Sequence, residues 1–130
     1  PDVHLRLMLY KRISAAANAE ELREFQVELI DRFGLLSHAT KNLIRIAAIK
    51  KSARALGVEK IDAADKGGYL VFATQSHIDA VALVQLVQND SRRYRLQSSH
   101  RLQIIDDLTK VEARFRAVEN LLQTLAVKNS

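Results

Sequence analysis

The spacing of apolar residues changes at Gly57, and the change restricts the chain to folds that combine helices with a sheet. Before Gly57, apolar residues recur every three or four positions, as on one face of a helix. After it, the run Tyr69–Ala73 (YLVFA) is short, β-branched and aromatic, which is typical of a strand. The turn sequence Asp65–Gly68 (DKGG) predicts a β-hairpin that joins this run to Val58–Asp62. Because the run is apolar on both faces, we predict a central strand with both faces covered.

Five helices and a second hairpin complete the predicted elements. The helices are expected at residues 3–17, 18–34, 39–56, 77–89 and 106–126, and the second hairpin at residues 92–97 and 101–105. Ser37, Ser76 and Asp106 are the expected caps of the last three helices. This order predicts an α+β fold, in which a helical hairpin and further helices pack on a small antiparallel sheet built from two β-hairpins.

Length and composition indicate a soluble globular chain. With 130 residues, 48% of them hydrophobic, residues 1–130 are expected to form a single domain. There is no cysteine, which fits an intracellular compartment, and we expect a cytoplasmic location. No apolar run approaches the roughly 18 residues that span a bilayer, so no membrane contact is expected. The chain begins with Pro1, which suggests a part of a longer protein.

No motif for catalysis or for cofactor binding is found. The four histidines are far apart in the sequence, and none has a second ligand at metal-binding spacing; they are His4, His38, His77 and His100. Glycine motifs that bind dinucleotides or triphosphates are also missing. Asp106 and Asp107 are adjacent, so on a helix their side chains diverge by about 100°. We therefore predict a domain that is not an enzyme, without catalytic residues, cofactor or metal.

Basic residues suggest one possible function, the binding of nucleic acid. The net charge is +5 and the pI is about 9.8, which permits contact with phosphates. Two groups carry this alternative: the predicted third helix with Lys41, Arg45, Lys50, Lys51 and Arg54, and the run Arg92–Arg95. Both also have a structural explanation, because cations favour a helix C-terminus and alternation is typical of a half-buried strand. No second aromatic residue near Tyr94 is placed to build a stacking surface.

Acidic residues on the predicted second helix suggest a different function, the binding of a basic partner. The helix has a capping Asn18 and a terminating Gly34, and its apolar stripe is Leu22, Phe25, Leu29 and Phe33. Glu24, Glu28 and Asp31 follow at i, i+4 and i+7 and share the opposite face. A uniformly acidic face in a basic chain favours a partner with arginines, although a solvated face is the simpler explanation. Partner binding requires these carboxylates to point outward, without ion pairs inside the chain.

The stretch VELIDRFGLL (Val27–Leu36), with the preceding RLMLYKRI (Arg6–Ile13), resembles the C-terminal domain of bacterial transcription-repair coupling factors. The similarity continues through DKGG, through YRL (Tyr94–Leu96) and through the closing helix, so it covers nearly the whole chain. Ser37 is a departure, because the family commonly has proline there. The parent protein of this family is an ATP-driven translocase, a helicase-type hydrolase that binds double-stranded DNA in transcription-coupled nucleotide excision repair.

The resemblance implies a regulatory role for this domain. In the family, the parent protein displaces stalled RNA polymerase and recruits the damage sensor UvrA. The terminal domain packs on a UvrB-like N-terminal module of the same polypeptide and masks the surface that UvrA uses. Carried over by motif, Glu28 and Asp31 are the expected acidic contacts to arginines of that module, and Glu24 and Arg32 are further candidates. The motor motifs lie outside this chain.

Overall fold

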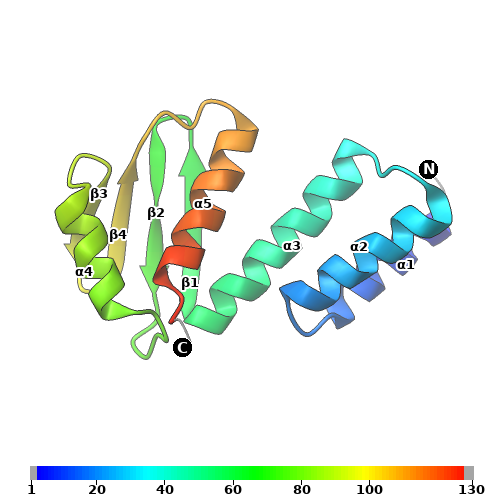
Figure 1. Cartoon of the computed structure of the whole chain (residues 1–130), viewed down its shortest axis with the longest axis horizontal. Coiled ribbons are helices and arrows are strands. Elements are labelled where there is room, and N and C mark those ends of the chain that lie inside the picture. Colours follow the sequence, from blue (N-terminus) through cyan, green and yellow to red (C-terminus); the bar gives the residue numbers. More distant parts are fainter. Residues whose placement is uncertain (1–2, 128–130) are drawn as a thin grey trace. The chain divides into compact units, whose positions relative to one another are not determined.

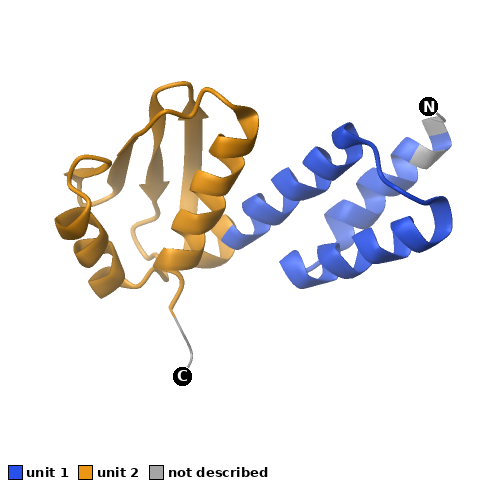
Figure 2. Ribbon diagram, turned by 45° about the horizontal axis from the view of Figure 1, so that its top comes forward, with its two compact units in different colours: residues 1–52 blue, residues 53–130 orange. Residues whose placement is uncertain are grey.

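The computed structural model describes residues 3–127, which form five helices and four strands. In order these are α1 (Val3–Ala15), α2 (Ala19–Phe33), α3 (His38–Leu56), β1 (Val58–Ala64), β2 (Gly67–Phe72), α4 (Ala80–Asn89), β3 (Tyr94–Ser98), β4 (Arg101–Ile105) and α5 (Val111–Leu125). The chain divides into two compact units, unit 1 at residues 1–52 and unit 2 at residues 53–130 (Figure 2). That residues 1–130 act as one domain stays a prediction.

In unit 1, α1 and α2 form the predicted helical hairpin (Figure 1). The Asn18 side chain accepts a hydrogen bond from the Glu21 N–H at 2.9 Å, which confirms the predicted cap. The Glu21 carboxylate in turn accepts from the Ala17 N–H at 2.6 Å, one residue before the cap. At the other end Gly34 has φ of 80°, and its N–H donates to the Ile30 carbonyl at 2.8 Å. Helix α2 therefore has a defined start and a defined end.

The core of unit 1 is built by all three of its helices. Its buried side chains are Ile13, Leu22, Phe25, Leu29 and Ile44. Three of the four residues in the predicted stripe of α2 are thus buried, but Phe33 in the last turn is 58% exposed. The buried part of α2 ends at Leu29. The acidic residues up to Glu28 therefore lie on a stretch of helix whose opposite face packs in the core of unit 1.

Helix α3 begins and ends as the sequence predicts. The Ser37 hydroxyl accepts from the Thr40 N–H at 3.2 Å. Gly57 follows the last residue with φ of 79°, and a Cβ there would lie 2.7 Å from the Ser76 Cα. Glycine is therefore required by conformation and by space.

Unit 2 contains a four-stranded antiparallel sheet in the order β1-β2-β4-β3. Each predicted hairpin supplies two neighbouring strands, and Leu70 of β2 pairs with Ile61 of β1 and with Leu102 of β4. Leu70 and Leu102 have no exposed surface. Helix α4 contacts β3 and α5 contacts β1, and both helices lie over the same face of the sheet (Figure 1). The predicted α+β class is confirmed.

Only one face of the sheet is covered by helices of unit 2. Strand β2 is central, as predicted, and Leu70 and Phe72 are buried against the helices. The alternate residues Tyr69 and Val71 are half-buried on the opposite face. The prediction that both faces are covered is therefore wrong, because α4 and α5 stand side by side on one of them. The uncovered face is called the open sheet face below.

The predicted start of α4 at Ser76 and His77 is also wrong. The helix begins at Ala80, and the Asp79 carboxylate caps it by accepting from the Ala82 N–H at 3.1 Å. The preceding backbone is held by other partners: the Asp79 N–H donates to the Leu125 carbonyl at 2.8 Å, and Ile78 forms a β-bridge with Ala126. These long-range contacts keep residues 77–79 extended.

The predicted cap of the last helix at Asp106 fails for a similar reason. The Asp106 and Leu108 N–H groups donate to the carbonyls of Lys66 and Asp65, which ties this segment to the β1–β2 turn. Helix α5 begins only at Val111 and has no side-chain cap. Nearby, β3 begins at Tyr94, so Arg92 and Arg93 lie in a turn and not in the predicted strand.

Candidate docking face

The three carboxylates predicted for partner binding lie on α2, between its two caps. Glu24 and Asp31 are exposed, and no described lysine or arginine comes within ion-pair distance of either. Glu28 is partly exposed and has a partner inside the chain. Together with Arg32, which is also exposed, these residues form what we call the docking face.

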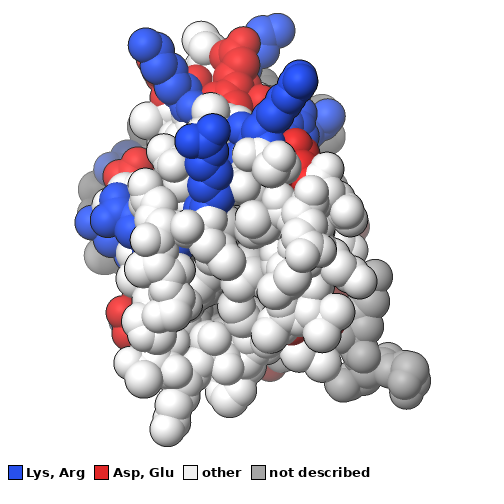
Figure 3. Space-filling view, turned by 90° about the vertical axis from the view of Figure 1, so that its left-hand side faces the viewer, with Lys and Arg blue, Asp and Glu red and all other residues white. Residues whose placement is uncertain are grey.

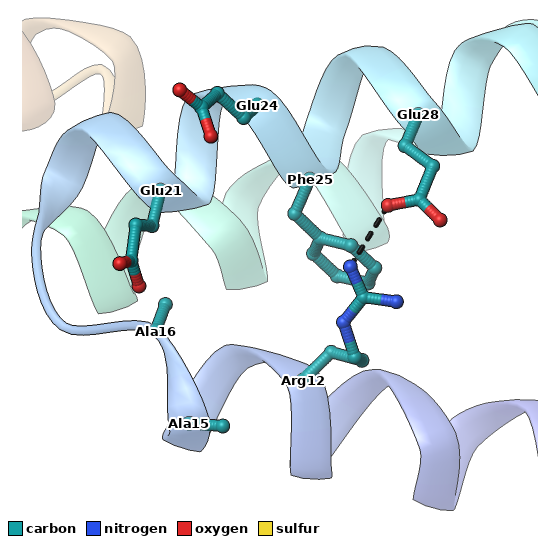
Figure 4. A pocket seen from close by; sticks show the side chains of 7 residues that line it. All are labelled: Arg12, Ala15, Ala16, Glu21, Glu24, Phe25 and Glu28. Carbon is teal, nitrogen blue, oxygen red and sulfur yellow. Dashed lines mark hydrogen bonds and ion pairs between the residues drawn. The ribbon is translucent and has the colours of Figure 1, made fainter.

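Glu28 forms an ion pair with Arg12, from the last turns of α1 (Figure 4). The Arg12 Nη2 atom donates to the Glu28 Oε2 atom at 2.8 Å. The same guanidinium carbon lies 4.6 Å from the centre of the Phe25 ring, so it also makes a cation–π contact. The expectation of unpaired carboxylates is therefore wrong for Glu28, while Glu24 and Asp31 match it.

This ion pair determines the charge state of Glu28. The hydrogen bond from Arg12, reinforced by its positive charge, holds the pKa of Glu28 below its ordinary value of 4.5. Partial burial opposes this shift, and the charge of Arg32 adds to it. Glu28 is therefore ionised at neutral pH.

A shallow hollow of about 300 Å³ lies between α1 and α2 (Figure 4). Its lining combines three carboxylates with small and aromatic apolar groups: Arg12, Ala15, Ala16, Glu21, Glu24, Phe25 and Glu28. Asp31 and Arg32 do not line it. The docking face thus has two parts, a hollow around Glu24 and Glu28, and an exposed end with Asp31 and Arg32.

Arg12 is the residue of this candidate site that the sequence reasoning missed. A signal for it was present, because Arg12 is the basic residue in the last turn of a helix joined to α2 by a short link. Two helices joined by so short a link form an antiparallel hairpin, so a side chain near the end of α1 lies alongside α2. Its pairing with Glu28, sixteen residues later, depends on the packing of the two helices.

The other groups considered from the sequence, the possible metal ligands, the Asp106–Asp107 pair and the basic run Arg92–Arg95, do not form a site of this kind. Among residues 3–127, no three His, Cys, Asp or Glu side chains are placed to hold a metal ion. Asp107 accepts hydrogen bonds from the N–H and the hydroxyl of Thr109, and these bonds lower the pKa of Asp107. Its carboxylate therefore has a structural role in a turn. Arg93, from the predicted basic strand, lies near the carboxylates of Asp90 and Asp106, at 3.9 and 3.7 Å. None of the described helices is both long and apolar enough to cross a bilayer.

Comparison with known proteins gives consistent matches. The TRCF domain family matches residues 1–83. The transcription-repair-coupling factors of Escherichia coli (strain K12) and of Haemophilus influenzae are each 40% identical to this chain over 125 residues, which is 96% of the chain. The chain spans only 11% of the length of these two relatives.

A solved structure shares the fold. It is described as the C-terminal domain of a transcription-repair coupling factor; it matches with a TM-score of 0.73 at 20% identity and covers 95% of this chain and 83% of its own. The fold is thus that of a C-terminal domain of a coupling factor. From the family match and the relatives together, the chain belongs to the TRCF domain family of transcription-repair coupling factors.

Proposed function

We propose that this chain is a regulatory domain that docks on a UvrB-like N-terminal module of its own polypeptide and masks the surface that UvrA uses. Docking holds until the ATP-driven motor of the whole protein, working on double-stranded DNA in the cytoplasm, engages stalled RNA polymerase. The chain itself performs no chemical step in this proposal. Its partner-binding residues are Glu28 and Asp31, with Glu24 and Arg32 beside them.

The observation that carries the proposal is the acidic face of α2. Glu24 and Asp31 are exposed on a helix capped at both ends and fixed on its other side by Leu22, Phe25 and Leu29. A rigid helix presents carboxylates to a partner without a large loss of conformational freedom on binding. Arginines are the natural partners, because their planar fork fits a carboxylate with two hydrogen bonds.

The contacts of Arg12 support the same choice of partner. The hollow already holds one guanidinium, stacked on Phe25 and paired with Glu28. An arginine of the module therefore competes with Arg12 for Glu28. Such competition keeps docking modest, which suits a contact that must release, since regulatory couplings are typically about 1–3 kcal/mol.

The test is UvrA binding by the full-length factor with charge reversal at the docking face. Asp31→Arg is the cleaner single variant, because Glu28→Arg places a second guanidinium beside Arg12. We expect Asp31→Arg to raise UvrA affinity several-fold, and the double variant with Glu28→Arg to raise it further. The Arg12→Gln variant should act in the opposite direction, because it frees Glu28 for the module.

The matched control is a double charge reversal in unit 2, Glu59→Arg with Asp62→Arg, which changes net charge equally and leaves the docking face intact. It should leave UvrA affinity unchanged. Unaltered UvrA binding in the Glu28→Arg and Asp31→Arg double variant, with folding preserved by circular dichroism, would refute the docking role.

A further inference from the structure

The open sheet face brings together three cations that are far apart in the sequence. Lys60 on β1 and Arg101 on β4 both pair with Val71 of β2, so they lie in one row across the sheet. Arg95 on β3 pairs with Gln103 of β4, in the next row. All three cations are exposed, and alternation along each strand turns them away from α4 and α5.

An aromatic ring connects the first two cations. The Arg101 guanidinium carbon lies 3.9 Å from the centre of the Tyr69 ring, and the Lys60 Nζ lies 5.5 Å from it. Tyr69 pairs with Gln103 on β4, which places the ring in the same row as Arg95. A hydrogen bond with Tyr69 raises the pKa of Lys60, so the ammonium group stays charged at neutral pH.

Acidic residues do not neutralise this surface. Asp62, on β1 opposite Tyr69, is an acidic residue that the strand register places on the same face. No described carboxylate lies within ion-pair distance of Lys60, Arg95 or Arg101, whereas Arg93 at the edge is near two. Among the residues that the strand register places on this face, the three cations outnumber the carboxylate of Asp62.

The opposite side of unit 2 differs in character. Helix α4 contains no charged residue between Ala80 and Asn89. In the view onto the side of α4 and β3, the lysines and arginines gather toward one end, and most of the remaining surface is uncharged (Figure 3). Helix α4 therefore offers a polyanion no positive charge, and the two arginines of α5, Arg114 and Arg116, are already paired with Asp65 and Glu112.

We propose that the open sheet face binds a single strand of nucleic acid, with its phosphates on Lys60, Arg95 and Arg101. A flat sheet face with cations and a stacked aromatic residue is suited to a strand whose bases are free to stack. The Tyr69 ring holds the Arg101 guanidinium in place, and a guanidinium plane is a surface on which an unpaired base stacks. The carboxylates of an acidic peptide can pair with the three cations, but such a peptide has no base to stack on the Arg101 guanidinium. The observations therefore favour nucleic acid. The site is separate from the docking face and independent of the proposed function.

The test is fluorescence anisotropy with the whole 130-residue chain and a labelled 20-nucleotide single strand, as DNA and as RNA. With three phosphate contacts, affinity should fall about 20-fold between 50 and 200 mM salt. The triple variant Lys60→Gln, Arg95→Gln and Arg101→Gln should lose at least about tenfold at 50 mM salt and most of its salt dependence. Arg95→Gln alone, which leaves the Tyr69 stack intact, should reduce the logarithmic salt slope by about 0.7.

The matched control removes three positive charges from α3, with Lys41→Gln, Lys50→Gln and Arg54→Gln. It should keep nearly the full affinity, and an equal loss in this control would show that net charge alone binds the strand. Three further results overturn the proposal: no binding by the unmodified chain at 50 mM salt, tighter binding of a duplex of equal length, or equal competition by polyglutamate. A preference between DNA and RNA would identify which strand the face accepts.

Discussion

Arg12 contacts two features of α2 at once, the ring of Phe25 and the carboxylate of Glu28. The ring contact joins α1 to the hydrophobic core of unit 1, and at exposed sites such contacts contribute about 0.5–1 kcal/mol. The ion pair occupies the carboxylate that the docking proposal assigns to a partner. A single side chain thus links the stability of the helical hairpin to the availability of the docking face.

The Arg12–Glu28 pair predicts a pH dependence of stability. The pKa of Glu28 is lower in the folded chain than its ordinary value of 4.5. Glu28 therefore stabilises the folded state above that pH, and this contribution is lost as the pH falls through the lowered value. We expect the unmodified chain to resist urea better than Glu28→Gln near neutral pH, with the difference disappearing in acid.

The control for this experiment is the same comparison in an Arg12→Gln background. There the guanidinium is absent, so Glu28→Gln should have little effect at either pH. A difference between the unmodified chain and Glu28→Gln that stays constant from neutral to acid pH would contradict the assignment of the shift to Arg12.

At the scale of the elements, the structure and the sequence disagree about where two helices begin. Serine and aspartate at a spacing of three make Ser76 a reasonable cap, yet Asp79 caps α4 and the chain before it is extended. The β-bridge of Ile78 with Ala126 draws residues 77–79 toward the end of the chain. Local capping signals mark several possible helix starts, and tertiary contacts determine which of them is used.

The position of this cap is directly testable. Asp79→Ala removes the acceptor for the Ala82 N–H and should lower the free energy of unfolding by about 1 kcal/mol. Ser76→Ala removes no capping bond of α4 and should have a smaller effect. Urea denaturation of both variants measures the difference. A larger loss from Ser76→Ala would place the start of α4 where the sequence alone predicts it.

At the scale of the whole molecule, each compact unit has buried residues of its own. Leu22, in unit 1, is 1% exposed and belongs to the cluster formed by α1, α2 and α3. Leu102, in unit 2, has no exposed surface and lies in the centre of the sheet. Each cluster can therefore be truncated without removing a side chain of the other.

This division predicts unequal local stability after core truncation. Leu22→Ala should cost about 2–5 kcal/mol in the stability of unit 1. Amide hydrogen exchange should then accelerate in α1, α2 and the first turns of α3, with the strands of unit 2 largely protected. Leu102→Ala is the matched control, with the reverse pattern. Uniform loss of protection along the chain in both variants would show that residues 1–130 unfold as one cooperative domain.

The sequence by itself determined the fold class, the hairpins and the well-marked helix α2. These features depend on local signals: apolar spacing, the DKGG turn, the Asn18 cap and the Gly34 stop. Such signals act within a few residues, and they can therefore be recognised from the sequence alone. They also place Glu24, Glu28 and Asp31 on one side of a helix, because helical geometry alone fixes their relative angles.

Only the tertiary structure decided which side chains meet across elements. The pairing of Arg12 with Glu28 and the gathering of Lys60, Tyr69 and Arg101 depend on helix packing and strand register. The open sheet face has the same origin, because a run such as YLVFA is apolar whether helices cover one face or two. Contacts between distant residues are selected by the packing of the whole chain, and no local pattern in the sequence records that selection.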